Sequence, residues 1–241
     1  MTVFLFTLAS AVANVLGAAA VVSRRKWSSA SLELLLGVAA GFMIAVALID
    51  MLPAAYAGGG RTAALVVLSG FVLVHLTQHV LARHFHFGEE THPVSASVGA
   101  SALVGLGVHT LVDGVAIASG FAVSRSLGLL VFLAIFLHKF PEGLAIGSVF
   151  LASGASRTRA LGAAALLGVF TVVGGLLAGA VPALGTYGLA LSAGVTLYVA
   201  GSNLVPELQK QRRGTLAAAF LAGCLLYLLA SSAAGAITST P

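Results

Sequence analysis

Charged residues are scarce in this chain. Of its 241 residues only 8% are Asp, Glu, Lys or Arg, whereas 59% are hydrophobic. A soluble globular domain carries about a quarter charged residues, so this composition excludes one. Apolar runs of roughly 20 residues, the length that crosses a bilayer as a helix, recur along the chain. The sequence therefore predicts an all-α, polytopic membrane protein in which each helix satisfies its own backbone.

Cysteine is scarcer still, because Cys224 is the only one. A single cysteine excludes an intramolecular disulfide and any metal cluster built from cysteine. Acidic residues number seven against twelve Lys and Arg, which gives a formal net charge of +5. The basic residues form short clusters between apolar runs, so we expect them to set membrane orientation and predict no nucleic-acid partner.

Breaks in hydrophobicity divide the chain into eight apolar segments with short connections, which predicts one transmembrane domain over residues 1–241. The segments lie near 2–22, 31–55, 62–83, 95–121, 127–152, 159–181, 185–206 and 214–236. The first is interpreted as a retained helix and not a signal peptide, because no charge precedes it and "SRRKW" follows it.

Lys and Arg are divided unequally between the two ends of these segments. Nine lie in the connections after segments 1, 3, 5 and 7, whereas only Arg61 and Arg125 lie in the others. Cytoplasmic loops are enriched in Lys and Arg. Both termini are therefore predicted to face outward from a cell membrane.

One thirteen-residue pattern occurs twice, as "HTLVDGVAIASGF" at 109–121 and "HKFPEGLAIGSVF" at 138–150. Each copy places a histidine four residues before an acid followed by glycine. Positions i and i+4 share one face of a helix, so His109 should project with Asp113 and His138 with Glu142. A single such pair is often only a structural hydrogen bond, but two copies with matched flanks favour a shared site.

The two motifs lie midway along segments four and five, which run antiparallel. Facing helices would bring two imidazoles and two carboxylates together near the bilayer midplane. This set of ligands suits Zn²⁺ and, with less specificity, Fe²⁺, Mn²⁺ or Cd²⁺. A bare carboxylate at that depth costs about 2.5–3.5 kcal/mol, and a divalent cation would offset the charge of both.

The paired motifs resemble those of the ZIP (Zrt/Irt-like) family of divalent metal transporters. "HTLVDG" is similar to the family's fourth-span His-Asn-x-x-acid-Gly motif and "HKFPEG" to its fifth-span His-x-x-Pro-Glu-Gly motif. The similarity extends to "GFMIAVALIDMLP", "GGLLAGAVPALG" and "LYVAGSNLVPEL". The resemblance implies an eight-helix bundle with both ends outside, a metal path between spans 2, 4, 5 and 7, and often a homodimer.

The chain departs from the family where many members bind a second metal. That centre uses the residue after each motif histidine and a glutamate in span 6, and these positions hold Thr110, Lys139 and Thr171 here. Threonine is a poor ligand for these metals and a protonated lysine is none. We therefore expect one metal, with the Lys139 ammonium near the place of a second cation. The alternative is that Lys139 points away from the site.

Further residues are candidates for the path of the metal. Met43 is a soft ligand or a core residue, and Asp50, seven residues later on the same helical face, either collects cations at the outer mouth or caps a helix end. The stretches "AVALIDMLPAA" and "YVAGSNLVPEL" echo each other in oppositely directed spans, as inverted repeats of transporters do. Asn203 and Glu207 of the second stretch could guide exit, although Glu207 could equally be a surface acid.

A histidine cluster is predicted on the cytoplasmic side. His75 and His79 are four residues apart at the inner end of span 3, and His84, His86 and His92 follow in the loop. Histidine is a common metal ligand that titrates near neutral pH, so the cluster could receive or sense metal.

The predicted function is transport of a divalent metal into the cytoplasm through a mononuclear site, with zinc as the first candidate, and not enzymatic catalysis. The competing interpretation is an intramembrane metal-dependent hydrolase, in which a metal-bound water attacks a lipid amide or peptide bond. Against it, the chain lacks H-E-x-x-H, and a site that uses four protein ligands leaves no open position for water.

Overall fold

The computed structural model describes residues 2–23, 29–78, 96–206 and 214–238, and the regular structure in these ranges is entirely helical. Within these ranges, seven helices are long and apolar enough to cross a membrane. The prediction of an all-α, polytopic membrane protein is confirmed at this level.

Most helix bounds lie within a few residues of the predicted segments, but segments two and three are joined in one helical stretch, Glu33–Leu76, and the predicted end of segment three lies outside the described residues. In order the helices are α1 (Thr2–Val22), α2 (Ser29–Val46), η1 (Ala47–Met51), α3 (Leu52–Leu76), α4 (Ala96–Val123), α5 (Arg125–Ala152), α6 (Arg157–Ala180), α7 (Pro182–Tyr198), η3 (Val199–Leu204) and α9 (Gly214–Thr238). The elements η1 and η3 are single π-helical turns that continue α2 and α7.

One apolar helical stretch, Glu33–Leu76, is 44 residues long. At 1.5 Å per residue a straight helix of that length would extend about 66 Å, roughly twice the hydrocarbon thickness of a bilayer. It is not straight, because Gly60 has φ 52° and ψ −134°. Only glycine takes this conformation without strain. The break lies where the sequence predicts the connection between segments two and three.

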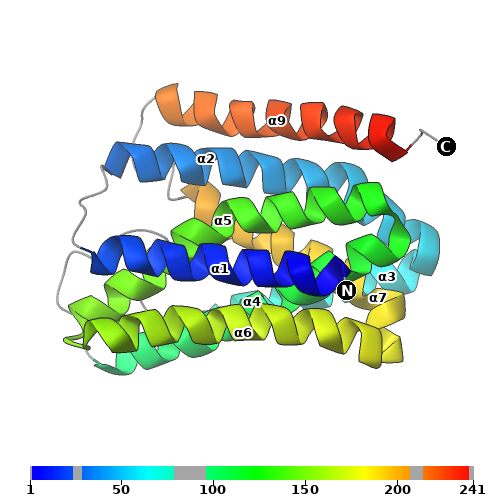
Figure 1. The fold of residues 1–241 in the computed structure, drawn as a ribbon. Helices are drawn as coiled ribbons and strands as arrows, with labels where there is room; N and C mark the ends of the chain where they lie inside the picture. The colour runs from blue at the N-terminus through cyan, green and yellow to red at the C-terminus, as the bar shows by residue number, and fades with distance from the viewer. Residues whose placement is uncertain (1, 24–28, 79–95, 207–213, 239–241) are drawn as a thin grey trace.

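The helices form two groups that lie side by side. α1, α4, α5 and α6 pack against one another, and α2, α3, α7 and α9 form the second group. Contacts of α4 with α7 and of α2 with α5 join the groups. α9 lies on the outer side of α2, and the start of α1 and the end of α9 are at the same end of the bundle (Figure 1).

Reciprocal glycines bring four pairs of helices into backbone contact. A Cβ on Gly143 of α5 would overlap the carbonyl oxygen of Asn14 on α1, and one on Gly114 of α4 would overlap that of Thr171 on α6. Glycines at such interfaces allow membrane helices to approach closely. The same arrangement joins α3 to α7 through Gly70 and Gly194, and α2 to α9 through Gly41 and Gly223.

The two π turns occupy matching places in the echoing stretches of spans 2 and 7. η1 ends at Met51 and η3 at Leu204, each two residues before a proline, Pro53 or Pro206. Proline cannot donate to the carbonyl four residues earlier, and a π turn rearranges the hydrogen-bond ladder around such a defect. The sequence echo therefore corresponds to a shared backbone distortion.

The π turn in span 2 also changes which residues share a face. A π turn inserts one residue relative to an α-helix, so the position two turns beyond Met43 is taken by Met51 and not by Asp50. Met43 and Met51 are buried, whereas Asp50 is half-buried. The expectation that Asp50 continues the Met43 face is therefore wrong for this helix.

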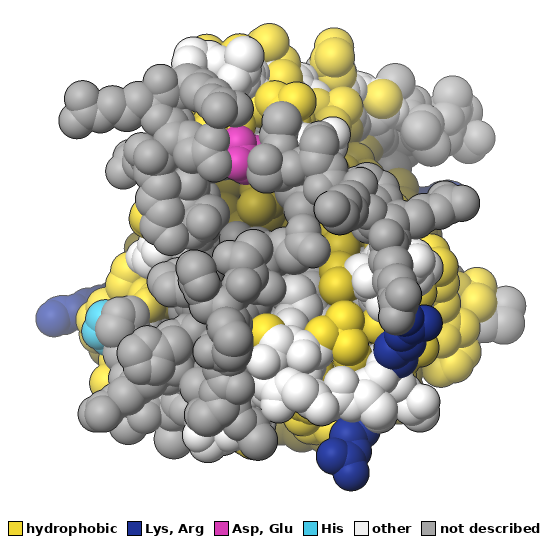
Figure 2. All heavy atoms as spheres, turned by 90° about the vertical axis from the view of Figure 1, so that its left-hand side faces the viewer, with side chains coloured by type: hydrophobic (Ala, Val, Ile, Leu, Met, Phe, Trp, Pro, Cys, Tyr) yellow, Lys and Arg dark blue, Asp and Glu magenta, His cyan; other side chains and the backbone are white. Residues whose placement is uncertain are grey.

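The outer faces of the bundle are apolar, as contact with lipid requires. Large hydrophobic side chains such as Leu221, Leu225 and Leu229 of α9 are exposed. Figure 2 looks onto the end of the bundle where α6 begins, with Lys and Arg side chains at its edge and hydrophobic side chains around its sides. Arg157 and Arg159 are exposed in the first turn of α6.

The glycine contacts predict a difference between two matched alanine substitutions. Gly194→Ala should lower the stability by about 1–3 kcal/mol, because its methyl group would overlap the carbonyl oxygen of Val67 on α3. Gly162→Ala on α6 meets open space and should be neutral or slightly stabilising. The midpoint of thermal unfolding in detergent measures both, and equal midpoints would contradict the packing described.

Candidate metal site

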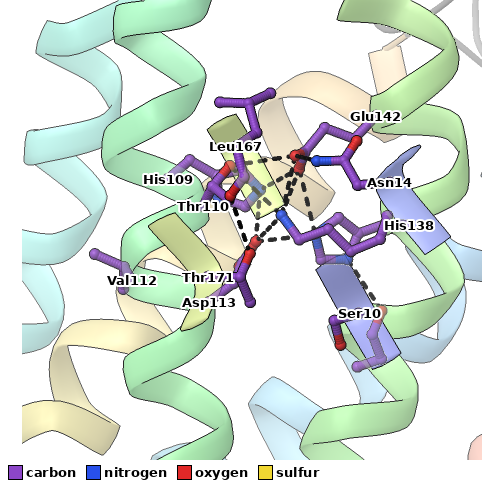
Figure 3. A network of polar contacts seen from close by, with 12 residues as sticks. Ser10, Asn14, His109, Thr110, Val112, Asp113, His138, Glu142, Leu167 and Thr171 are labelled. Atoms are coloured by element: carbon purple, nitrogen blue, oxygen red, sulfur yellow. Dashed lines mark hydrogen bonds and ion pairs between the residues drawn. The ribbon is translucent and has the colours of Figure 1, made fainter. Parts of the chain in front are cut away.

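The doubled motif forms one buried cluster between α4 and α5. His109 and His138 each lie thirteen residues after the first residue of a 28-residue helix, so both are at mid-length. One ligand atom from each of His109, Asp113, His138 and Glu142 lies within 4.8 Å of the other three. All four side chains are buried and converge on one point (Figure 3).

The spacing of these atoms matches that of a tetrahedral metal. Ligand atoms bonded to Zn²⁺ at 2.0–2.1 Å are about 3.3 Å apart in a tetrahedron. The Nε2 atom of His109 lies 3.3 Å from Asp113 Oδ2 and 3.4 Å from Glu142 Oε2. The Nε2 atom of His138 lies 3.4 Å and 4.0 Å from the same two oxygens. Three of these four distances are close to the spacing that a small tetrahedral ion requires.

The two imidazoles differ in their hydrogen bonds, and only that of His138 is oriented as a metal ligand usually is. Nδ1 of His138 lies 3.0 Å from the carbonyl oxygen of Ala134, and donation to that oxygen leaves the Nε2 lone pair free for a metal. Neither ring nitrogen of His109 has a hydrogen-bond partner within the described part of the chain. Buried polar atoms are rarely left so, and a metal would satisfy Nε2.

Lys139 points into this cluster. Its Nζ atom lies 2.7 Å from Asp113 Oδ2 and 2.8 Å from Glu142 Oε2, and the lysine is fully buried. These are the same two oxygens that face the imidazoles. With both acids ionised and Lys139 protonated, the three side chains sum to −1, and one divalent ion would bring the sum to +1. A metal and the ammonium would compete for the two oxygens.

The second oxygen of Glu142 is held by residues outside the ligand set. Asn14 Nδ2 of α1 donates to Glu142 Oε1 at 3.0 Å, and Thr110 Oγ1 donates to it at 3.2 Å. Lys139 Nζ lies 3.0 Å from the same atom. The motif analysis missed Asn14. The signal that could have found it is an amide in an otherwise apolar span, where polar side chains need partners.

Two further residues of the predicted centre, Thr171 and Met43, do not belong to the cluster of four ligand atoms. Thr171 is buried, but its Oγ1 donates to the Leu167 carbonyl of its own helix at 3.4 Å. Met43 is buried in the hydrophobic core and remains a candidate for the metal path.

Asp50 contacts α9 instead of standing alone at a mouth. It accepts a hydrogen bond from the Tyr227 hydroxyl at 2.7 Å. The helix continues through it from η1 into α3, so there is no helix end for it to cap. Asn203 is half-buried in η3, and its Nδ2 has no hydrogen-bond partner among residues 2–23, 29–78, 96–206 and 214–238.

The predicted histidine cluster is described only in part. His75 is exposed, and its ring lies 5.7 Å from that of Tyr198 on α7. His79, His84, His86 and His92 lie outside the described residues, as does Glu207.

The ion pairs of Lys139 predict how the empty site responds to its loss. Lys139→Met should lower the thermal midpoint of metal-free protein, since removing one member of a buried ion-pair network costs about 3–5 kcal/mol. Zinc should then stabilise this variant more than the wild type, because no ammonium competes with it. Arg125→Met, at an exposed residue that begins α5, is the control. If Lys139→Met and the wild type unfold at the same temperature in the presence of a chelator, the ion pairs of Lys139 do not stabilise the metal-free protein.

Comparison with known proteins also points to metal transporters. The model of the family described as ZIP zinc transporter matches residues 88–231. The Xenopus laevis protein zinc transporter ZIP9-B is 32% identical over 189 residues, which are 67% of this chain and 62% of the relative. The Micropogonias undulatus zinc transporter ZIP9 is 35% identical over 154 residues, covering 57% of this chain and 49% of the relative.

The chain thus spans less than two thirds of the length of either relative. The family model nevertheless covers more than half of the chain, including both histidine motifs and the helices that carry them. The chain belongs to the ZIP zinc transporter family.

Proposed function

We propose that this chain transports a divalent metal, zinc foremost, across a membrane through one site formed by His109, Asp113, His138 and Glu142. The observation that carries the proposal is the convergence of these four ligand atoms within 4.8 Å at mid-length of two buried helices. Zinc ranks first because the relatives named above are called zinc transporters and because the spacing suits a small tetrahedral ion. Iron, manganese and cadmium accept similar ligands.

A single bound metal is the proposed stoichiometry. The Lys139 ammonium already contributes one positive charge beside both carboxylates, which disfavours a second metal ion there. Thr110 already donates to Glu142, and Thr171 donates within its own helix. None of these three side chains offers an anionic or imidazole ligand, so the chemistry for a second ion is lacking at these positions.

Eight crossings with both termini outside remain the proposed topology. The break at Gly60 divides the 44-residue helix into two segments. The start of α1 and the end of α9 lie at one end of the bundle (Figure 1), which requires an even number of crossings. The basic connections then lie in the cytoplasm, and an inside-negative potential of 100 mV favours inward movement of a 2+ ion by about 4.6 kcal/mol.

The path on either side of the site is proposed from the polar residues of spans 2 and 7. In this path Asp50 would serve the outer side and Asn203 the inner side, with Met43 as a soft contact between them, and Glu207, outside the described residues, stays a candidate for exit. The histidines at and beyond the end of α3 would receive the metal in the cytoplasm. A homodimer in the cell membrane is the proposed assembly.

The hydrolase interpretation is disfavoured by membership in a transporter family. The geometry agrees, because both carboxylates are engaged by Lys139 and face the imidazoles. Neither is left as a free general base beside an open metal position.

Substitution of the ligands should abolish transport. His109→Ala and Glu142→Ala each remove one of four ligands, so uptake of radioactive zinc into proteoliposomes should fall to the level of empty vesicles. Ser69→Ala is the matched control, because this exposed hydroxyl of α3 donates to the Leu65 carbonyl of its own helix. Wild-type uptake by both ligand variants would refute the assignment. Metal-dependent hydrolysis of a lipid amide or peptide without zinc flux would favour the hydrolase instead.

A further inference from the structure

The contact of α1 with α5 repeats the contact of α4 with α6. Gly143 meets the backbone of Asn14 and Gly17 meets that of Phe140, while Gly114 meets Thr171 and Gly174 meets Leu111. The residues of α4 and α5 in these contacts are 29 positions apart, as in the doubled motif, and those of α1 and α6 are 157 positions apart throughout. Asn14 therefore occupies on the Glu142 side the position that Thr171 occupies on the Asp113 side.

The two equivalent residues use their side chains differently. Both are fully buried. Thr171 Oγ1 donates within α6, to the Leu167 carbonyl. The Asn14 amide instead crosses to another helix and donates to Glu142 Oε1 at 3.0 Å. A carboxylate only accepts hydrogen bonds, so Asn14 must present its amino group. Its Oδ1 has no hydrogen-bond partner in the described part of the chain, so this one contact sets its orientation.

We propose that Asn14 is a positioning residue of the metal site, which ties one oxygen of Glu142 and leaves the other to bind the metal. The inference rests on the proposed function of the cluster. Oε1 accepts from Asn14, Thr110 and Lys139 at 3.0, 3.2 and 3.0 Å. Oε2 is the oxygen that faces the Nε2 atom of His109, at 3.4 Å.

The same arrangement gives Lys139 a place when metal binds. An ion on Asp113 Oδ2 and Glu142 Oε2 displaces the ammonium from both atoms. Glu142 Oε1 and Thr110 Oγ1, at 3.0 and 3.5 Å from Nζ, remain as its partners. With Asn14 donating to Oε1 beside Thr110 and Lys139, Glu142 is held against rotation that would bind the ion through both oxygens.

One-oxygen binding by Glu142 keeps the number of ligands at four, the number that Zn²⁺ prefers. Mn²⁺ favours more oxygen ligands. Loss of the Asn14 amide removes one of the three donors to Oε1, which weakens the hold on this oxygen and should shift the preference of the site from zinc toward manganese. A residue that only fills space between α1 and α5 has no reason to change this preference.

The test is equilibrium binding of Zn²⁺ and of Mn²⁺ to the purified full chain, with X-ray absorption of the zinc complex. Asn14→Leu has similar volume and no donor, and Asn14→Ala removes the amide without adding bulk. Each should weaken zinc binding about tenfold, the effect of one hydrogen bond to a charged group, weaken manganese binding less, and add an oxygen to the zinc shell. Ser10→Ala is the control, because this buried hydroxyl lies one turn earlier on α1 and bonds to its own helix, at the Phe6 carbonyl.

The outcomes separate this inference from the proposed function. If the wild-type chain binds neither ion, the proposed function fails. If the wild type binds zinc and the folded Asn14 variants match it, the positioning role is overturned while the function stands. Equal weakening of both ions, with an unchanged zinc spectrum, would likewise overturn positioning and leave only a packing role. If Asn14→Leu does not fold, Asn14→Ala is measured alone. An unchanged ratio of zinc affinity to manganese affinity in that variant overturns the positioning role.

Discussion

The structure depends on how two carboxylates are kept at the centre of a membrane-spanning bundle. Asp113 and Glu142 share the Lys139 ammonium at 2.7 and 2.8 Å, and all three side chains are buried. Removing the Lys139 ammonium would leave both carboxylates unpaired where water is absent, which is costly in a low dielectric. The lysine therefore stabilises the two carboxylates in the absence of metal, and in the proposed function a divalent metal would replace it on the same oxygens.

Close packing makes this arrangement rigid. The glycine after each acid, Gly114 or Gly143, lets a further helix lie against the motif at backbone distance. α6 packs on the Asp113 side and α1 on the Glu142 side, so a neighbouring helix restricts the movement of each acid. Only on one side does the packed helix also supply a hydrogen bond to the acid, through Asn14. The acid–glycine pair of the motif is thus as much a packing device as a chemical one.

Much of the fold and the ligand set follow from local rules of the sequence. Hydropathy predicts the helices, and the spacing of His109 with Asp113 and of His138 with Glu142 predicts their shared faces. Other features depend on contacts that no local pattern encodes. Lys139 lies about 100° round the helix from His138, so whether its long side chain reaches the acids is decided by the neighbouring helices. Asn14 lacks a motif, and the register of Asp50 changes because a π turn precedes Pro53.

The most direct test of this account is a structure of the full chain with zinc, located by its anomalous scattering. The account predicts one zinc peak per chain, bonded to Nε2 of both histidines and to one oxygen each of Asp113 and Glu142. Lys139 Nζ should move from those oxygens toward Glu142 Oε1 and Thr110. Zinc at another place, two ions in the cluster, or an unmoved lysine between the two acids would contradict it.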